Sequence, residues 1–405
     1  MTITVTENDS LILSEETLRE TGREIRDAFR ALISENGVLP RPTVLSRTWK
    51  LDQTLCTRMC GALRNDDPLA ALYQLPGPPS LKELTAAATR VRVEPARLQD
   101  ATEKLRLYEN LIRHVGGKKS NLDTLVGSSV IEAREKTEQR SKQSIFRGTT
   151  NLYGVQSEAA MTSYFVYPSP EDGFVNELAL YGSVGMRRLR PELPILVGGR
   201  LLEHIPDGVR ANAAELLHRE TLHDDGFSTA LKEFSTQPFP HVDVIRDGRR
   251  LLYVLPGDEG GTYEELTLLF ASIERNAFPL RCDANHPAAY FGFVPRNPSK
   301  ELMLDVFIHQ SVWPGLSPRI EMTRNDTTLA STVAPIDRFD FCEVVESLGS
   351  EPARRGTRAV PKYEEVLGWV SQNQGWDLGD FRLFRLNVKY PVIGLRYILY
   401  FDLPK

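Results

Sequence analysis

Five basic residues and one acidic residue stand close together near the N-terminus, within residues 41–64. The basic residues are Arg41, Arg47, Lys50, Arg58 and Arg64, and the acidic residue is Asp52. Guanidinium and ammonium groups bind phosphate, and salt limits the reach of each charge to about 8–10 Å, so a local patch acts independently of the total charge. The segment therefore predicts a phosphate-binding surface, although the whole chain has a net charge of −5.

Residues 45–59, LSRTWKLDQTLCTRM, have the pattern of two short helices joined by a tight turn. That pattern needs an apolar and a small residue early on the first helix, an apolar anchor on either side of the turn, and a cap for the second helix. These positions are held by Leu45, Ser46, Trp49, Leu51 and Asp52. The second helix would bury Leu55, Cys56, Met59 and Leu63 and expose Gln53, Thr54, Thr57, Arg58 and Arg64. The outer face is small, polar and basic.

This stretch resembles the bacterial helix-turn-helix regulators, whose common pattern is Leu-Ala-x-x-Leu-Gly-Val-Ser-x-x-x-Val-Ser-Arg. The matching positions are Leu45, Ser46, Trp49, Lys50, Leu51, Asp52, Cys56, Thr57 and Arg58. The resemblance covers this motif, and more of the N-terminal region if the preceding helix is the first of a three-helix unit. Lys50 departs from it because Gly is usual in the turn, and a left-handed backbone at Lys50 costs about 1 kcal/mol. Ser46 replaces the usual Ala.

The resemblance implies that the second helix, residues 52–64, lies in the major groove of DNA. The residues near base edges or flanking phosphates would be Gln53, Thr54, Thr57 and Arg58. Gln can pair with adenine, Arg with guanine, and Thr with a base or the thymine methyl group. The residues that hold phosphates without reading sequence would be Arg41, Arg47, Lys50 and Arg64. Because one such unit binds weakly, a dimer with two copies about 34 Å apart is implied.

A different interpretation of the same pattern stays open. Three-helix units of this kind also serve as packing or protein-docking modules, and a short degenerate motif occurs by chance. The alternative function is therefore a structural or protein-interaction module that forms an oligomeric assembly and does not bind DNA. Cys56 and Cys60, one helical turn apart, could hold a metal with a third ligand, but Cys56 is better explained as a small apolar group on the inner face.

Other chemically capable groups lack the partners that their chemistry needs. His218 and His223 are five residues apart, which does not place two imidazoles on one helical face. The segment LVGGRLL at residues 196–202 lacks a phosphate-binding glycine pattern, and we interpret it as a turn. Cys282 and His286 have no visible orienting partner for nucleophilic catalysis. We therefore predict no metal, no cofactor and no enzymatic activity.

Composition predicts a soluble globular protein of several domains. The chain has 405 residues, which is too long for one ordinary hydrophobic core. Its composition, 41% hydrophobic and 25% charged, is typical of a soluble globular protein. No apolar run approaches the roughly 18–20 residues of a membrane span. Glu7 and Asp9 stand where a signal peptide would carry basic residues, and four cysteines make no disulfide framework. We expect a cytoplasmic location and no membrane partner.

The N-terminal region is predicted to be helical throughout. Ser14 can cap an amphipathic helix that ends near Asn36, and Pro42 opens the next helix. Two domains are expected here: residues 1–79, a helical domain with the helix-turn-helix, and residues 80–150, a helical linker or second helical unit. Residues 1–150 hold 23 basic and 20 acidic residues, whereas residues 151–405 hold 26 and 34, so the positive part is N-terminal.

Residues 151–405 are predicted to form an α+β, strand-rich region for sensing or oligomerisation. HVDVIRDGRRLLYVLP suggests a hairpin around Asp247 and Gly248, and FRLFRLNVKYPVIGLRYILYFDLPK at the C-terminus is strand-like. Helices are expected near residues 211–223 and 263–276. Short similarities, such as ELAL at 177–180 and ELML at 301–304, suggest two related halves, about residues 151–280 and 281–405.

Together these features predict an α+β multidomain fold, with an all-helical N-terminal region and a mixed, strand-rich C-terminal region. The expected function is sequence-specific DNA binding by a transcriptional regulator whose C-terminal region binds an effector or a second copy. The expected partners are double-stranded DNA, the chain itself as a homodimer or higher oligomer, and an unidentified small-molecule or protein effector.

Overall fold

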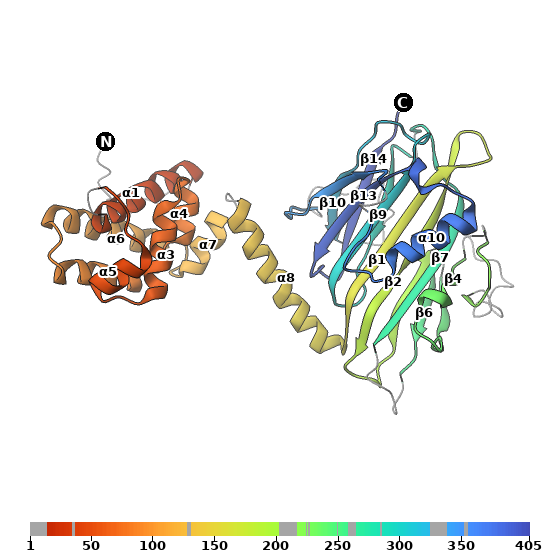
Figure 1. The fold of residues 1–405 in the computed structure, drawn as a ribbon, viewed down its shortest axis with the longest axis horizontal. Helices are drawn as coiled ribbons and strands as arrows, with labels where there is room; N and C mark the ends of the chain where they lie inside the picture. Colours follow the sequence, from red (N-terminus) through yellow and green to blue (C-terminus); the bar gives the residue numbers. More distant parts are fainter. Residues whose placement is uncertain are drawn as a thin grey trace. The chain divides into compact units, whose positions relative to one another are not determined.

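The structure is a computed structural model, and the chain forms two compact units, Met1–Glu138 and Gln139–Lys405 (Figure 1). The structure describes residues 14–34, 37–127, 131–201, 217–223, 225, 227–248, 250–257, 265–283, 286–324, 338–351 and 355–405. The first unit is helical and the second is rich in strands, so the predicted α+β class with this order of regions is confirmed. The expected domain boundaries after residues 79 and 150 stay predictions.

The first unit consists of a series of helices joined by short turns. They are α1 (Glu15–Ile33), α2 (Pro42–Trp49), α3 (Gln53–Arg64), α4 (Pro68–Gln74), α5 (Pro78–Arg90), α6 (Pro95–His114) and α7 (Lys119–Gly127). Ser14 caps α1 as predicted, because its hydroxyl accepts a hydrogen bond of 3.2 Å from the backbone N–H of Thr17. A proline in the first turn opens α2, α4, α5 and α6, where its missing N–H costs nothing.

One hydrophobic core holds these helices together. The inner face of α1, including Ile25 and Phe29, packs in one cluster with buried residues of the other helices. Gly22 lies on the same face, and a Cβ atom there would stand 2.5 Å from the carbonyl oxygen of Pro68. The absence of a side chain at this position therefore allows α1 to approach the start of α4 closely.

Helix α8 (Ile131–Tyr153) begins in the first unit and ends in the second. Its C-terminal half packs within the strand-rich unit, where Lys142 forms an ion pair with Glu343 and the ring of Phe146 lies 5.3 Å from that of Tyr390. None of the described helices has both the length and the apolar character that a membrane span requires.

The described strands of the second unit form three sheets. The largest contains, in spatial order, β12 (Val345–Gly349), β13 (Phe381–Lys389), β9 (Ser299–His309), β1 (Val155–Pro168), β2 (Phe174–Arg188), β7 (Leu266–Pro279) and β4 (Thr229–Ala230). The second contains β11 (Arg338–Phe339), β10 (Arg319–Arg324), β14 (Leu395–Asp402) and β8 (Ala288–Phe293). The third contains β3 (Ile195–Leu201), β6 (Arg250–Leu255) and β5 (Asp243–Asp247). Among the described strands, β1 and β9 pair in parallel and the other neighbours pair antiparallel.

The large sheet is covered on both faces. Helix α10 (Tyr363–Gln374) crosses one face near β1, β2 and β7, and contributes Val366 and Val370 to the core that contains Met161 and Phe165 (Figure 1). Alternate residues of β1, such as Val166, face the opposite side and pack in the core of the second sheet. The third sheet shares a further core with β7 on this same side. The two smaller sheets thus cover different parts of one face.

Sequence patterns located some strands correctly and others not. The hairpin around Asp247 and Gly248 is confirmed as β5 and β6, and the C-terminal run forms β13 and β14. The prediction of a helix at residues 263–276 is wrong, because Leu266–Pro279 forms β7, a strand buried on both faces whose continuous apolar run resembles a buried helix. The prediction of a turn at LVGGRLL is also wrong, since residues 196–201 of this segment lie in β3, which pairs with β6. The helix expected near 211–223 lies largely outside the described residues.

The segments that suggested two related halves do not occupy equivalent places. ELAL lies in β2, which pairs with β1 in the large sheet. ELML lies in β9, also in the large sheet, whereas the strand that precedes it, β8, belongs to the second sheet. The short sequence similarity therefore has no matching arrangement of strands.

Candidate nucleic-acid interface

Helices α2 and α3 form the two-helix motif expected from residues 45–64, and specific hydrogen bonds fix the turn between them. The hydroxyl of Ser46 donates to the carbonyl oxygen of Leu51 at 2.7 Å, and the N–H of Leu51 donates to the carbonyl oxygen of Ser46 at 3.1 Å. Asp52 caps α3, because its Oδ1 accepts a hydrogen bond of 3.0 Å from the N–H of Leu55. This bond lowers the pKa of Asp52, so the cap stays ionised near neutral pH.

Lys50 lies in the turn with φ 53° and ψ 50°, the left-handed conformation that the motif requires at this point. Glycine adopts this backbone freely, whereas a residue with a Cβ atom is strained by about 1 kcal/mol. The backbone strain predicted for Lys50, where the regulator pattern has Gly, is therefore present. The side chain of Lys50 places an exposed ammonium group on the turn.

The inner face of the motif is part of the helical core. Leu45 and Trp49 of α2 are buried, as are Leu55 and Met59 of α3, and all belong to the cluster that contains α1. Leu51 is buried in the turn. The alternation of apolar and polar residues therefore orients α3 as the sequence predicted, with one side against the unit's core.

The opposite face of the motif is exposed. Each predicted contact residue is exposed within its unit: Arg41, Arg47, Lys50, Gln53, Thr54, Thr57, Arg58 and Arg64. The hydroxyl of Thr57 donates to the carbonyl oxygen of Gln53 at 2.9 Å, which leaves its oxygen free to accept a further bond. Over the described residues, no carboxylate forms an ion pair with any of the five basic side chains. Their charges are thus available to a ligand.

A sixth basic residue near this surface was not predicted. Lys119, at the start of α7, has a pKa that burial lowers and that the nearby charge of Arg58 lowers further, while its bond to Asp123 opposes both effects. Its Nζ also donates to the carbonyl oxygen of Tyr73 at 3.0 Å. Lys119 is therefore committed to structural contacts, and no local sequence pattern links it to α3.

The two cysteines of α3 are buried and pack in the helical core. Burial raises the pKa of Cys56 to about 11 and raises that of Cys60, so both are thiols rather than metal-binding thiolates at neutral pH. The Sγ of Cys60 donates to the carbonyl oxygen of Pro40 at 3.7 Å. Throughout the described part of the chain, no cluster of three or more His, Cys, Asp or Glu residues could hold a metal ion.

The other polar candidates are not assembled into a site. His218 and His223 are both exposed. The Nδ1 atom of His286 lies 3.1 Å from the carboxylate of Asp283, while Cys282 is held through its backbone N–H by the carbonyl oxygen of Pro404. The described contacts of Cys282 and His286 therefore contain no nucleophile and base arranged for catalysis.

Comparisons with known proteins give no family for this chain. No family model and no curated protein matches it. One solved structure, from Parabacteroides distasonis and described as a "putative protease", has a TM-score of 0.26 and 7% sequence identity to it. That match covers 62% of this chain, which spans 41% of the other.

Proposed function

We propose that this chain is a cytoplasmic, sequence-specific DNA-binding protein that regulates transcription through α3. The observation that carries the proposal is the exposed outer face of the two-helix motif, where five basic side chains have no ion-pair partner among the described residues. Five basic charges held together beside a single acidic residue, Asp52, attract a polyanion. Because the charge of the whole chain is negative, we expect DNA to be attracted to this basic surface and not to the rest of the chain.

The exposed residues divide into two chemical groups. Gln53, Thr54, Thr57 and Arg58 lie in the first half of α3, the part of a recognition helix that meets base edges in the major groove. The surrounding cations, Arg41, Arg47, Lys50 and Arg64, lie at the ends of α2 and α3 and would contact phosphates. The first group would determine which sequence is bound, and the second would determine affinity and its dependence on salt.

The proposed working form is a homodimer that presents two copies of α3 to half-sites about 34 Å apart, one turn of the double helix. The second unit would supply self-association or bind an effector. A dimer raises the affinity because each protomer adds its own phosphate contacts.

Titration of the full chain with labelled duplex DNA at 50 and 200 mM salt tests the proposal. Four phosphate contacts per protomer predict a slope of log affinity against log salt of about −3.6, so the affinity of one protomer falls about 150-fold over this range. Arg58→Ala should cost about 1–3 kcal/mol on a preferred sequence, because it removes a base contact.

Arg113→Ala is the matched control, since Arg113 is an exposed arginine at the end of α6 and not in the motif. It should bind DNA as the unaltered chain does. A salt-independent titration, or equal binding by Arg58→Ala and the unaltered chain, would instead support the structural or protein-interaction module. Light scattering that shows large assemblies without DNA affinity would point the same way.

A further inference from the structure

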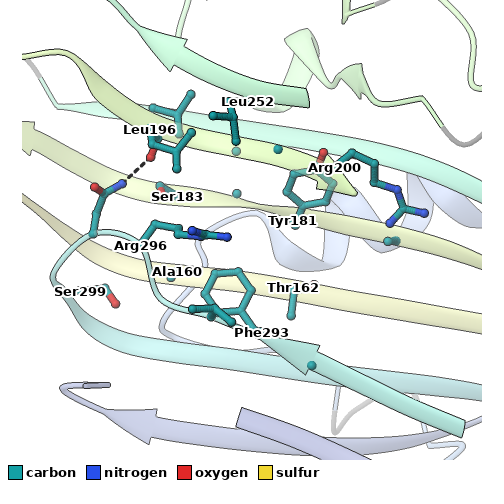
Figure 2. Close-up of a pocket in the computed structure, with 18 of the residues that line it drawn as sticks. Ala160, Thr162, Tyr181, Ser183, Leu196, Arg200, Leu252, Phe293, Arg296 and Ser299 are labelled. Atoms are coloured by element: carbon teal, nitrogen blue, oxygen red, sulfur yellow. Dashed lines mark hydrogen bonds between the residues drawn. The ribbon is translucent and has the colours of Figure 1, made fainter. Parts of the chain in front are cut away.

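A cavity of about 290 Å³ lies in the strand-rich unit, on the side of the large sheet that faces away from α10. Its floor is formed by alternate residues of β1 and β2, among them Thr162, Tyr181 and Ser183, and its walls come from β3, β6 and the segment that follows β8 (Figure 2). The two smaller sheets leave this part of the sheet face open. The volume is near the lower end of the range of about 300–1,000 Å³ that small-molecule sites occupy.

The floor is polar where a sheet face in this position is normally apolar. Thr162 and Ser183 are both buried and carry hydroxyl groups, and the small side chains of Ala160 and Ala179 leave room beside them. The hydroxyl of Tyr164 donates to the carbonyl oxygen of Gly292 at 2.7 Å, which ties β1 to the end of β8. The floor therefore offers hydrogen-bonding groups in a space that side chains do not fill.

The described residues that line the cavity include four arginines and no acidic residue. Arg200 is compensated, because its guanidinium lies 2.6 Å from the carboxylate of Glu274. Arg250, Arg296 and Arg396 form no ion pair with any carboxylate that the structure describes. Three positive charges from separate segments thus converge on one space, and none of them has a carboxylate partner among the described residues.

Arg296 lies close enough to Arg250 and Arg396 for their charges to act on it. Burial lowers the pKa of Arg296, and the charges of Arg250 and Arg396 lower it further. In Figure 2 the side chain of Arg296 reaches from the segment after β8 into the space between Tyr181 and Phe293. An arrangement that is unfavourable in the free protein is explained if an anion occupies the space between the charges.

The walls of the cavity are held in place without a ligand. The side chain of Asn297 donates to the carbonyl oxygen of Leu196 at 2.7 Å, which joins the segment after β8 to β3 (Figure 2). Leu252 of β6 and Phe293 at the end of β8 also line the cavity and present apolar surface to it. The cavity therefore combines a cationic group of side chains with an apolar wall in a preformed space.

We propose that this cavity binds a small organic anion, whose carboxylate or phosphate group meets Arg250, Arg296 and Arg396 and whose apolar part contacts Leu252 and Phe293. The size of the cavity favours a molecule with one ring or a short chain rather than a polymer. Arginine suits this role because its guanidinium forms paired hydrogen bonds to either kind of anion. The proposal concerns the second unit alone and does not depend on DNA binding by α3.

Calorimetric titration of the full chain with four probes tests the proposal. Phenyl phosphate and benzoate carry both an anionic group and an apolar ring, inorganic phosphate lacks the ring, and benzamide lacks the charge. We expect phenyl phosphate or benzoate to bind at least tenfold more tightly than benzamide and inorganic phosphate. The stronger of the two ring compounds identifies the natural ligand as a phosphate ester or a carboxylate. Equal binding of the charged and neutral ring compounds, or no binding of either anion, overturns the proposal.

Variants of the unpaired arginines locate the binding. Arg296→Gln and Arg396→Gln should each lower the affinity for the tighter-binding probe at least tenfold, because each removes a charged hydrogen-bond donor. They should leave the melting temperature of the free protein unchanged or raise it, since each relieves repulsion. Arg187→Gln is the matched control, because Arg187 of β2 is exposed, paired with Glu265 and outside the cavity. Unchanged affinity in both cavity variants, or an equal loss in the control, would refute the assignment.

Discussion

The buried ion pair between Arg385 and Asp305 allows a sharp test of how the strand-rich unit is stabilised. The guanidinium of Arg385 donates to both carboxylate oxygens of Asp305, at 2.8 and 2.7 Å, from neighbouring strands of the large sheet. The carboxylate is fully buried and also accepts a bond of 2.7 Å from the hydroxyl of Tyr363. Burial alone would lower the pKa of Arg385, but the bonds to Asp305 raise it above its ordinary value, so the guanidinium is charged. Burial raises the pKa of Asp305, and the bonds and charge of Arg385 oppose that shift.

Asp305→Asn keeps the shape of the side chain and removes its charge, which leaves the guanidinium buried without a counter-ion. Breaking a buried pair in this way costs about 3–5 kcal/mol. Arg385 retains bonds to the carbonyl oxygens of Gly356 and Arg355, at 3.0 and 2.7 Å, but these do not neutralise it. At about 2–4 °C per kcal/mol for a unit of this size, the melting temperature should fall by about 6–20 °C.

Urea denaturation and calorimetry of the full chain measure both quantities. Glu265→Gln is the matched control, because the pair of Arg187 in β2 and Glu265, the residue before β7, is about half exposed and should contribute at most about 1 kcal/mol. The double variant Asp305→Leu with Arg385→Met should recover part of the loss, since it removes both charges together. If Asp305→Asn costs no more than Glu265→Gln, the reasoning from burial is wrong.

Three further predictions address other positions. Burial raises the pKa of Glu177 to about 7 from 4.5, so its contribution to stability is complete below pH 4.5 and is lost as pH rises through 7. The free energy of unfolding in urea should therefore differ less between pH 5 and pH 8 for Glu177→Gln than for the unaltered chain. Lys50→Gly should raise the free energy of unfolding by up to about 1 kcal/mol and weaken DNA binding, whereas Lys50→Ala should only weaken binding. Gly22→Ala should cost about 1–3 kcal/mol, because its Cβ would meet Pro68, whereas denaturation should show no loss for Gly148→Ala, which has open space.

Local sequence signals predicted the helical motif well because its structure depends on neighbouring residues. The cap at Asp52, the strained turn at Lys50 and the buried face around Met59 each follow from residues within a few positions of one another. The hairpin around Gly248 is local in the same sense. Where short-range hydrogen bonds and the period of apolar residues determine the backbone geometry, a single sequence is sufficient to predict the local structure.

Long-range features could not be predicted in this way. Asp305 and Arg385 are separated by 80 residues, and each lies in a run that indicates only a strand. A helix was expected near residues 263–276 because a strand that is buried on both faces, such as β7, has no alternation to identify it. The cavity arginines likewise come from β3, β6, β14 and the segment after β8, which only the folded sheets bring together.

The role of an arginine in this chain depends on whether it has a carboxylate partner, and not on how many arginines the chain contains. Arg385 and Arg200 have carboxylate partners, and their charges are used to join strands of the fold. Arg58 and Arg296 have none among the described residues, although the chain has more acidic than basic residues overall. If this distinction is correct, neutralising Arg385 will lower stability, whereas neutralising Arg58 or Arg296 will spare stability and weaken the binding of an anion. One set of glutamine variants, measured by both denaturation and titration, compares the two groups directly.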